Sequence, residues 1–348
     1  MGGDLGPRPC VEGAIAACQR FNIEVTLVGK ERALKRLLSA MRVSDRRINI
    51  VNAEDVVTMR DAPRDSLRKK NSSLAIAVDL VRKGECSAVV SPANTGAFLA
   101  HAMLSWRTLP GIKKPAIATP LPTLHDRVVI VDSGAVVDCK PHQLVNFGIM
   151  GATYAREVLG RANPRVGLLS NGEEETKGND LTIAAHKLLK KTGLNFLGNA
   201  EGRDVFTGDY DVIVCDGFVG NVVLKCAEGL AKTITELLKR EAKKSIPTSI
   251  GGALMLPAVK AVKRRTDYDE TGGAPLLGVN GVAIISHGSS NGKAIMNALR
   301  VAAESVSRDL VGHLKLDLAR YHDHMLAQGV TREEVAGESA PVPEKVAE

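Results

Sequence analysis

Five predicted strands are followed directly by loops of small and polar residues. These loops are rich in glycine, amide and hydroxyl side chains, and they lie at 91–97, 132–135, 170–180, 216–221 and 286–292. Glycine lets a backbone approach a ligand closely, and a helix N-terminus offers unpaired N–H groups to an anion. Because the carboxyl ends of parallel strands share one edge of a sheet, we expect one anion-binding site there. A single turn of this kind is often only a helix cap, so the hypothesis depends on all five loops.

Three side chains in these loops are the predicted catalytic groups. Lys177 follows three glutamates, and its ammonium group would hold an anion or stabilise an oxyanion, the alternative being a surface ion pair with those glutamates. His287 ends a predicted strand, where it would bind phosphate or transfer a proton unless it is a capping or core histidine. The amide of Asn221 would donate a hydrogen bond to phosphate or to an oxyanion.

The predicted substrate-binding residues come from the same loops, from the first residues of the chain and from the glycine-rich segment at 272–278. They are Gly3, Asp4, Asn94, Thr95, Gly96, Asp132, Asn171, Gly172, Glu173, Asp216, Gly217, Gly220, Gly273 and Ser289. Asp132 and Asp216 end strands, and the alternative for both is a cap on the following helix. The histidines near the C-terminus lack a cysteine or carboxylate array, so we expect no metal. The sequence contains no Walker or dinucleotide fingerprint, and we expect no cofactor.

Short β-branched runs alternate with amphipathic stretches along the chain. Strands are predicted at 23–28, 47–51, 88–91, 127–132, 165–170, 211–215 and 282–286, and helices at 11–20, 32–41, 72–83, 97–105, 144–159, 181–191, 222–244 and 294–310. Continuous apolar runs are typical of parallel strands that are covered on both faces. The sequence therefore predicts one α/β domain over residues 1–327 with a mainly parallel sheet, followed by a disordered tail at 328–348.

The stretch from Ser245 to Glu270 interrupts this alternation, because it is apolar and then strongly basic. One interpretation is an inserted helical hairpin at 245–270 that packs on the body or on another subunit. The other is a protruding amphipathic element that contacts a membrane surface or a partner. The predicted contact residues are Leu254, Met255, Leu256, Val259, Lys260, Lys263, Arg264 and Arg265.

The composition limits the class of partner. The chain has 348 residues with 46 Lys and Arg against 39 Asp and Glu, which gives a net charge of +7. Aromatic residues make up only 3%, which disfavours stacking on nucleic acid. We find no apolar run of the length that a membrane span requires and no C-x-x-C pair, and we expect a cytoplasmic protein. The basic excess fits either simple solubility or an anionic partner.

Several of these segments form a recognisable series. Met1-Gly2-Gly3-Asp4, Asn94-Thr95-Gly96-Ala97, Leu169-Ser170-Asn171-Gly172-Glu173-Glu174, Lys177-Gly178, Asp216-Gly217-Phe218-Val219-Gly220-Asn221, Gly272-Gly273-Ala274-Pro275-Leu276-Leu277-Gly278 and His287-Gly288 occur in this order up to about Arg320. Together they resemble the PlsX family, the bacterial acyl-ACP:phosphate acyltransferases of phospholipid synthesis. The resemblance departs at Pro92, Ala93, Val136 and Thr271, and the short strand that normally precedes Met-Gly-Gly-Asp is not seen.

The resemblance implies a fold and an activity. The fold would be a Rossmann-like three-layer α/β/α arrangement, like those of isocitrate and isopropylmalate dehydrogenases and phosphotransacetylase. The reaction would be the reversible transfer of a long-chain fatty acyl group from acyl carrier protein to inorganic phosphate. The protein would be a homodimer, peripherally bound at the inner face of the cell membrane, and a downstream glycerol-3-phosphate acyltransferase would use the acyl phosphate.

Three other functions remain open at this point. A phosphotransacetylase-like enzyme would use a coenzyme A thioester instead of acyl carrier protein. A β-decarboxylating dehydrogenase would need a metal held by clustered aspartates, and the sequence offers no such cluster. A non-catalytic scaffold would bind a carrier protein or nucleic acid, but five glycine-rich loops at strand ends favour an enzyme, and the low aromatic content disfavours nucleic acid.

Overall fold

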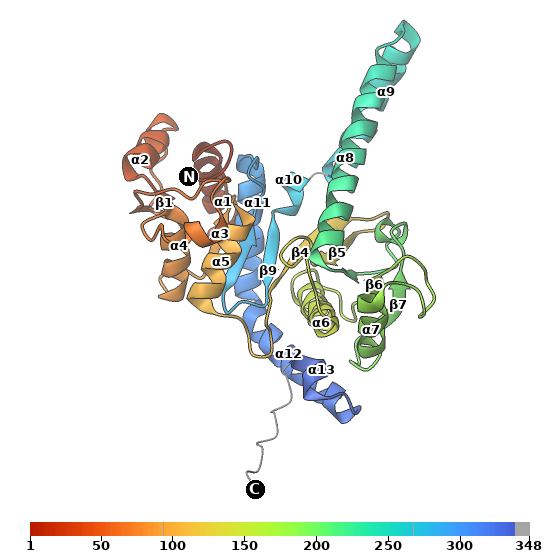
Figure 1. Cartoon of the computed structure of the whole chain (residues 1–348). Helices are drawn as coiled ribbons and strands as arrows, with labels where there is room; N and C mark the ends of the chain where they lie inside the picture. The colour runs from red at the N-terminus through yellow and green to blue at the C-terminus, as the bar shows by residue number, and fades with distance from the viewer. Residues whose placement is uncertain (93, 267, 338–348) are drawn as a thin grey trace.

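The computed structural model describes residues 1–92, 94–266 and 268–337 (Figure 1). Within these residues the main sheet has eight strands in the order β3-β10-β9-β4-β5-β8-β6-β7. Their bounds are β3 (Ala88–Ser91), β4 (Ala116–Pro122), β5 (Arg127–Val131), β6 (Val166–Leu169), β7 (Phe196–Ala200), β8 (Val212–Val214), β9 (Ala274–Leu277) and β10 (Val282–Ile285). A second sheet pairs β1 (Val25–Gly29) in parallel with β2 (Ile48–Asn52).

The two halves of the main sheet run in opposite directions. β3 and β10 are parallel to each other, and β5, β8, β6 and β7 are parallel to one another. Between the halves, β10 pairs with β9, β9 with β4 and β4 with β5, all antiparallel. Three reversals in a row make β5 antiparallel to β10. The prediction that all five loops leave one common carboxyl edge is therefore wrong, although most strand pairs are parallel.

Helices flank both sheets and complete a mixed α/β fold (Figure 1). They are α1 (Arg8–Phe21), α2 (Glu31–Ala40), α3 (Pro63–Ser66), α4 (Ser73–Arg82), α5 (Thr95–Trp106), α6 (Pro141–Glu157), α7 (Asp180–Leu189), the short 3₁₀-helix at Asp204–Phe206, α8 (Gly217–Ala242), α9 (Ile246–Thr266), α10 (Tyr268–Thr271), α11 (Gly292–Ser307), α12 (Leu310–Ala327) and α13 (Arg332–Ala336).

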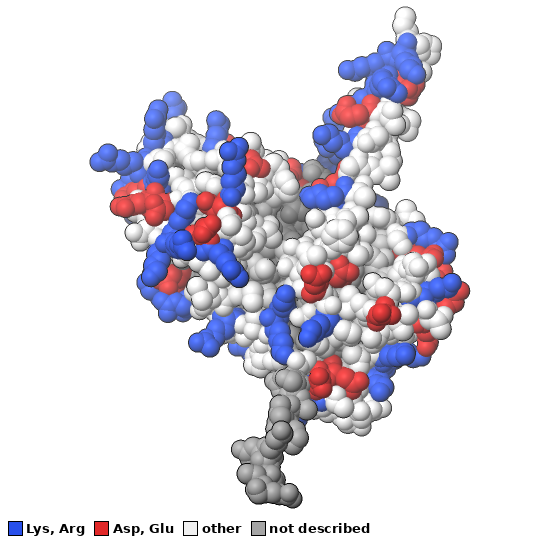
Figure 2. All heavy atoms as spheres, in the orientation of Figure 1, with Lys and Arg blue, Asp and Glu red and all other residues white. Residues whose placement is uncertain are grey.

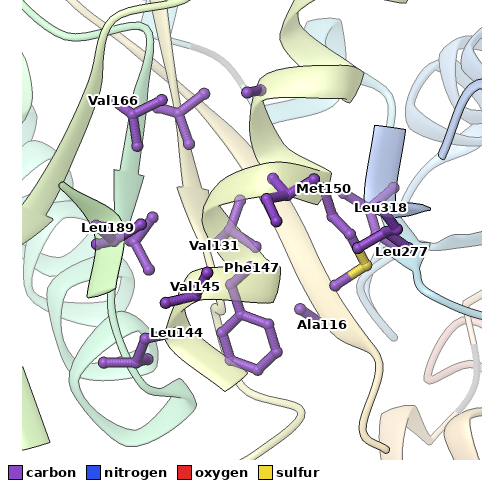
Figure 3. Close-up of a cluster of buried hydrophobic side chains, with 14 of the residues drawn as sticks. Ala116, Val131, Leu144, Val145, Phe147, Met150, Val166, Leu189, Leu277 and Leu318 are labelled. Atoms are coloured by element: carbon purple, nitrogen blue, oxygen red, sulfur yellow. The ribbon is translucent and has the colours of Figure 1, made fainter. Parts of the chain in front are cut away.

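Helix α6 lies at the centre of the largest hydrophobic core. Its residues 142–155 are all buried, and Figure 3 shows its apolar side chains with Leu189 of α7 on one side and Leu318 of α12 on the other. The core side chains labelled there are Ala116, Val131, Leu144, Val145, Phe147, Met150, Val166, Leu189, Leu277 and Leu318. This core supports β5 and β8 from behind, so the loops at their carboxyl ends start from a rigid base.

Helices α8 and α9 form an arm that protrudes from the body (Figure 1). Only Gly217 and Gly220 of α8 are buried. The predicted hairpin at 245–270 is not a hairpin by itself, because residues 246–266 form one helix with Pro257 inside it. This helix runs back along α8, so the two helices together make the hairpin. No helix in the described parts of the chain is long and apolar enough to cross a membrane.

The beginning of the predicted C-terminal tail belongs to the folded body. Val330 and Val335 are buried and join the core around α6. Thr331 caps α13, because its hydroxyl accepts a hydrogen bond from the amide of Glu334. The rest of the predicted tail, residues 338–348, lies outside the described residues.

Candidate active site

A buried carboxylate holds the loop that follows β5. The side chain of Asp132 is fully buried and accepts backbone hydrogen bonds from Ile117 (2.8 Å), Gly134 (3.2 Å), Ala135 (2.9 Å) and Val136 (2.7 Å). Its pKa is raised to about 6, because the loss of water on burial outweighs the four amide donors that favour the charged form. The carboxylate thus shapes the loop from beneath; it does not cap a helix, and it is not exposed to a substrate.

The N-terminus of α8 packs directly on Asp132. A Cβ atom on Gly217 would lie 2.6 Å from Asp132 Oδ2, and one on Gly220 would lie 1.9 Å from the Asp132 carbonyl oxygen. The amide of Gly217 donates to the Val136 carbonyl at 2.8 Å. Any side chain at Gly217 or Gly220 would therefore push α8 away from the β5 loop.

Asn221 is brought to the β5 loop by this packing. Asp216 caps α8 through a 2.9 Å hydrogen bond from the Val219 amide to its Oδ1, as the alternative interpretation of Asp216 expected. One turn further on, Asn221 is exposed, and a Cβ on Gly134 would lie 3.8 Å from its Cβ. An amide side chain, a helix N-terminus and a glycine loop therefore meet at the end of β5 and β8.

Lys177 has no partner for its ammonium group within the described residues, although three glutamates precede it. Glu173 pairs with Arg203 at 3.1 Å, and Glu175 pairs with Lys190 at 2.5 Å. Lys177 itself is exposed. Lys177 therefore does not form the alternative surface ion pair with its acidic neighbours. The charge of its ammonium group stays available to an anion.

Glu173 belongs to a small acidic cluster beside this loop. One carboxylate oxygen each of Glu173, Glu201 and Asp204 lies within 4.8 Å of the others, a spacing that could hold a cation. The guanidinium of Arg203 lies 3.1, 2.7 and 3.7 Å from the three carboxylates. Arg203 therefore supplies the positive charge that the cluster needs, and it occupies the Glu173 carboxylate that was predicted to bind substrate.

The loop after β10 presents His287 and Ser289, both exposed. His287 Nδ1 accepts a hydrogen bond from the Ser289 amide at 3.2 Å and lies 2.7 Å from the Ser289 hydroxyl. The proton of the neutral ring is then on Nε2, so this atom is the donor to a ligand. The loop also contacts the start of the chain, because the Asp4 amide donates to the Gly288 carbonyl at 2.8 Å.

Asn94 is a structural cap as well as a loop residue. Its Oδ1 accepts from the Ala97 amide at 3.0 Å, and its Nδ2 donates to the carbonyls of Met59 and Asp61. The side-chain groups predicted to bind phosphate are therefore used to hold the preceding loop. The N-terminal residues of α5, Thr95 and Gly96, remain half-buried at this end of β3.

The carboxyl ends of the two half-sheets lie at one level. Ile285, the last residue of β10, pairs with Ala274 of β9, and Val131, the last residue of β5, pairs with Ala118 of β4. The β9–β4 register places Ile285 within one residue row of Val131. With three strand spacings between them, the two ends are separated by roughly 14 Å. Because β10 and β5 run in opposite directions, the loop that carries His287 and the loop that Asn221 contacts leave the sheet in opposite directions, on either side of β9 and β4.

Comparisons with known proteins identify the family of the chain. A family model described as "fatty acid synthesis protein" matches residues 1–312. The chain belongs to this family. A phosphate acyltransferase from Syntrophotalea carbinolica is 49% identical over 336 residues, which cover 95% of this chain and 97% of that protein. Another, from Pelotomaculum thermopropionicum, is 51% identical over 90% of this chain and 92% of that protein. The resemblance to the PlsX family of phosphate acyltransferases is thereby confirmed.

Solved structures show the same fold at low sequence identity. A phosphotransacetylase from Streptococcus pyogenes has a TM-score of 0.64 and 15% identity, with 87% of this chain and 92% of that chain covered. The EutD phosphotransacetylase from Staphylococcus aureus has a TM-score of 0.60 and 14% identity, with 86% and 92% covered. The fold of this PlsX-family chain is thus that of phosphotransacetylases, with a mostly parallel sheet and flanking helices.

The predicted residues fall into two groups around β9 and β4. On one side Gly3 and Asp4 lie against the His287 loop, and Gly273 packs on the end of β10. On the other side Gly172 contacts the side chain of Lys177, and exposed Asn171 precedes it.

Sequence reasoning missed two serines in this region. Ser286 and Ser290 are buried, and their hydroxyl groups have no hydrogen-bond partner among the residues that the structure describes. Both lie in the loop after β10 on either side of His287. Their place directly after a strand could have singled them out.

Proposed function

We propose that this protein transfers a long-chain fatty acyl group from acyl carrier protein to inorganic phosphate and so supplies acyl phosphate for phospholipid synthesis. The observation that carries the proposal is the family membership, with phosphate acyltransferases 49% and 51% identical over nine-tenths or more of this chain. The free cation of Lys177 and two helix N-termini near the strand ends fit a reaction between two anionic partners.

We assign phosphate binding to the loop between β10 and α11. Nε2 of His287 is an exposed donor there, and the Ser289 hydroxyl, which donates to His287 Nδ1, holds the ring in this tautomer. Helix α11, which has sixteen residues, begins just beyond them at Gly292, and its dipole favours an anion at that end. Phosphate held here has an oxygen free to attack a thioester that enters from the opposite half of the sheet.

Lys177 and Asn221 act on the thioester. A phosphate oxygen bonds to the carbonyl carbon, whose oxygen becomes negative in the transition state. The ammonium of Lys177 and the amide of Asn221 stabilise this charge, and loss of one such donor commonly costs about 3 kcal/mol. The C–S bond then breaks, the thiolate leaves and takes up a proton, and acyl phosphate remains. Because a thiol has a pKa of about 8.5, the departing sulfur needs little help from an acid.

The arm is assigned to partner contacts. Leu254, Met255 and Leu256 of α9 are 78%, 62% and 46% exposed, and Lys260 and Arg264 follow on the same helix. Figure 2 shows charged residues along one side of the arm and uncharged ones along the other. An apolar surface beside basic side chains fits the anionic inner face of the cell membrane or an acidic carrier protein.

The part of the arm formed by α8 is the proposed contact with a second copy of the chain. Four exposed apolar residues of α8 repeat with helical spacing, and they are Leu230, Ile234, Leu237 and Leu238. A stripe of this kind on a helix that protrudes from the body is covered in solution. We therefore propose a cytoplasmic homodimer bound peripherally to the membrane, where a glycerol-3-phosphate acyltransferase takes up the acyl phosphate.

The donor and the site are tested in one assay. Thiol release from long-chain acyl carrier protein should require phosphate, and acetyl-CoA should be a poor donor. Lys177→Ala and Asn221→Ala should each lower kcat about a hundredfold, whereas Lys187→Ala, which removes an exposed lysine of α7, should leave it unchanged. Near-normal kcat for both site variants would reject this site, and a preference for acetyl-CoA would reject acyl carrier protein as the donor.

A further inference from the structure

A buried side chain ties the loop that carries Lys177 to the sheet. Residues 173–177 of this loop are all exposed, and the ion pairs of its glutamates lie at the surface, where such pairs contribute little to stability. Asn199 of β7, in contrast, is 5% exposed, and its Nδ2 donates to the Glu174 carbonyl at 2.8 Å. Asn199 therefore anchors the middle of this exposed run.

The same carbonyl belongs to the turn that carries Lys177. The Lys177 amide donates to the Glu174 carbonyl at 2.9 Å, so Asn199 and Lys177 share one acceptor. A Cβ on Gly172 would lie 2.7 Å from Lys177 Cγ, which means that the stem of the lysine packs directly on this glycine. Gly178, with φ +114°, then leads into α7. The position of Lys177 thus depends on where the Glu174 carbonyl is held.

A buried histidine orients the amide of Asn199. His186 lies on α7, which packs beside β6 and β7 (Figure 1), and it is 3% exposed. Its Nδ1 lies 2.8 Å from Asn199 Oδ1. Because Asn199 Nδ2 donates to Glu174, the oxygen is the acceptor, and the neutral ring carries its proton on Nδ1. A buried amide whose donor and acceptor are both bonded is held in one orientation.

A β-bulge in β7 turns Asn199 toward α7. Phe196 faces this helix, because its ring centroid lies 5.1 Å from that of His186. Side chains of a regular strand alternate between the two faces, so a residue three positions further on would point the other way. The pairing with β6 shifts by one residue between Phe196 and Gly198, and Gly198 has φ +106°. The bulge thereby returns Asn199 to the face of His186.

We propose that Asn199 and His186 are positioning residues for the acyl transfer. They hold the Glu174 carbonyl, and through it the turn at 174–177, so that the Lys177 ammonium stays where the oxyanion forms. Both side chains are buried and act through the loop, without touching the substrate. The inference rests on the role that the proposed function gives to Lys177. Loss of either side chain should lower kcat and leave KM for phosphate unchanged, because the phosphate loop belongs to the other half of the sheet.

The first test removes the donor of Asn199 without changing the size of the side chain. Asn199→Asp keeps the acceptor for His186 but places an oxygen against the Glu174 carbonyl. We expect kcat to fall about tenfold and deuterium exchange at the Lys177 amide to become faster, with exchange in α6 unchanged. The matched control is Asn195→Asp just before β7, where Nδ2 also donates to a backbone carbonyl, and it should behave as the natural chain. Unchanged kcat and exchange in Asn199→Asp would overturn the proposal.

A double-mutant cycle separates positioning from a general loss of stability. Because Asn199 acts through Lys177, Asn199→Asp should lower kcat by less than about twofold once Lys177 is already replaced by alanine. Losses that multiply in the double variant would overturn the proposal. A normal kcat for Lys177→Ala alone would reject the proposed site together with this inference. A low kcat for Lys177→Ala beside a normal kcat for Asn199→Asp would reject the inference alone.

Two substitutions at His186 repeat the test from α7 and leave β7 unchanged. His186→Asn retains a side-chain N–H close to the position of Nδ1, and it should keep most of kcat. His186→Leu has a similar size but no donor, and it should lower kcat as Asn199→Asp does. Both variants lose the ring contact with Phe196, so the difference between them reports the hydrogen bond to Asn199. An equal kcat for the two variants would reject a positioning role for His186.

Discussion

Asp132 illustrates how far single residues could be interpreted from the sequence. Its position after a β-branched run correctly indicated the end of a strand, and the alternatives were a substrate contact or a helix cap. The structure gives it a third role, because four backbone amides donate to its carboxylate, Gly217 packs on that carboxylate and Gly220 packs on its backbone carbonyl. Those glycines come more than eighty residues later in the chain, so only the folded arrangement reveals the contact.

Replacing Asp132 by Asn should change how stability depends on pH. Burial raises the pKa of Asp132 to about 6 from 3.8, so the native state retains the proton in a range where the unfolded chain loses it. This group therefore stabilises the fold below about pH 4, and the contribution is lost as the pH rises through 6. The unfolding free energy of Asp132→Asn relative to the natural chain should rise by on the order of 3 kcal/mol between pH 4 and 7.

Urea unfolding of both proteins across this pH range provides the measurement. The difference between the two unfolding free energies cancels the contribution of every carboxylate that titrates in the same way in both proteins. A difference that stays constant from pH 4 to 7 would contradict a raised pKa at Asp132.

At the scale of elements, the sequence located strands with continuous β-branched runs and missed three others. β3 was predicted with its observed bounds, and β5, β6, β8 and β10 within one residue at each end. The missed strands are β4, β7 and β9. β4 contains two prolines and β9 contains one, and Gly198 and Asn199 interrupt β7, all residues that usually argue against a strand.

The N-terminus of α8 should depend on its cap. Asp216→Ala removes the acceptor for the Val219 amide, which should cost about 1 kcal/mol of stability and lower kcat, because Asn221 lies one turn further along the helix. Asp216→Asn keeps an acceptor oxygen and should retain most of both. Urea unfolding and steady-state kinetics measure the two effects. Equal losses for the Ala and Asn variants would show that the negative charge, and not the cap, matters.

The arm should be required for membrane binding but not for chemistry. The double substitution Leu254→Glu and Leu256→Glu places charges on exposed apolar positions of α9. Co-sedimentation with vesicles containing anionic lipid should be lost, while turnover with a soluble acyl donor should be kept. The control is Leu104→Glu with Leu316→Glu, two leucines that are each 70% exposed on the body. Unchanged vesicle binding by the arm variant would reject the assignment.

At the scale of the whole molecule, the sequence indicated the fold class and the loops but not the direction of the half-sheets. The apolar runs predicted a mainly parallel sheet, yet β9 and β4 reverse its sense in the middle. Strand direction depends on long-range pairing that no local pattern records. The result is that the two sets of loops leave the sheet in opposite directions, on either side of these strands.

The net charge of +7 is consistent with the same view of the molecule. Both proposed partners, an acidic carrier protein and an anionic membrane, are attracted by a basic protein. Part of the basic excess lies on the arm, where Lys260, Arg264 and Arg265 are exposed near the apolar residues of α9. The proposed active site relies on glycines, amides and one lysine, so the charge of the whole chain and the chemistry proposed for the site are separate properties.

The product of the reaction tests the central claim most directly. Long-chain acyl carrier protein and inorganic phosphate are incubated with the enzyme, and acyl phosphate is followed by ³¹P NMR while free thiol is measured in parallel. The account predicts one acyl phosphate for each thiol released and almost none of either with Lys177→Ala. Release of thiol together with free fatty acid, or no release in the presence of phosphate, would contradict it.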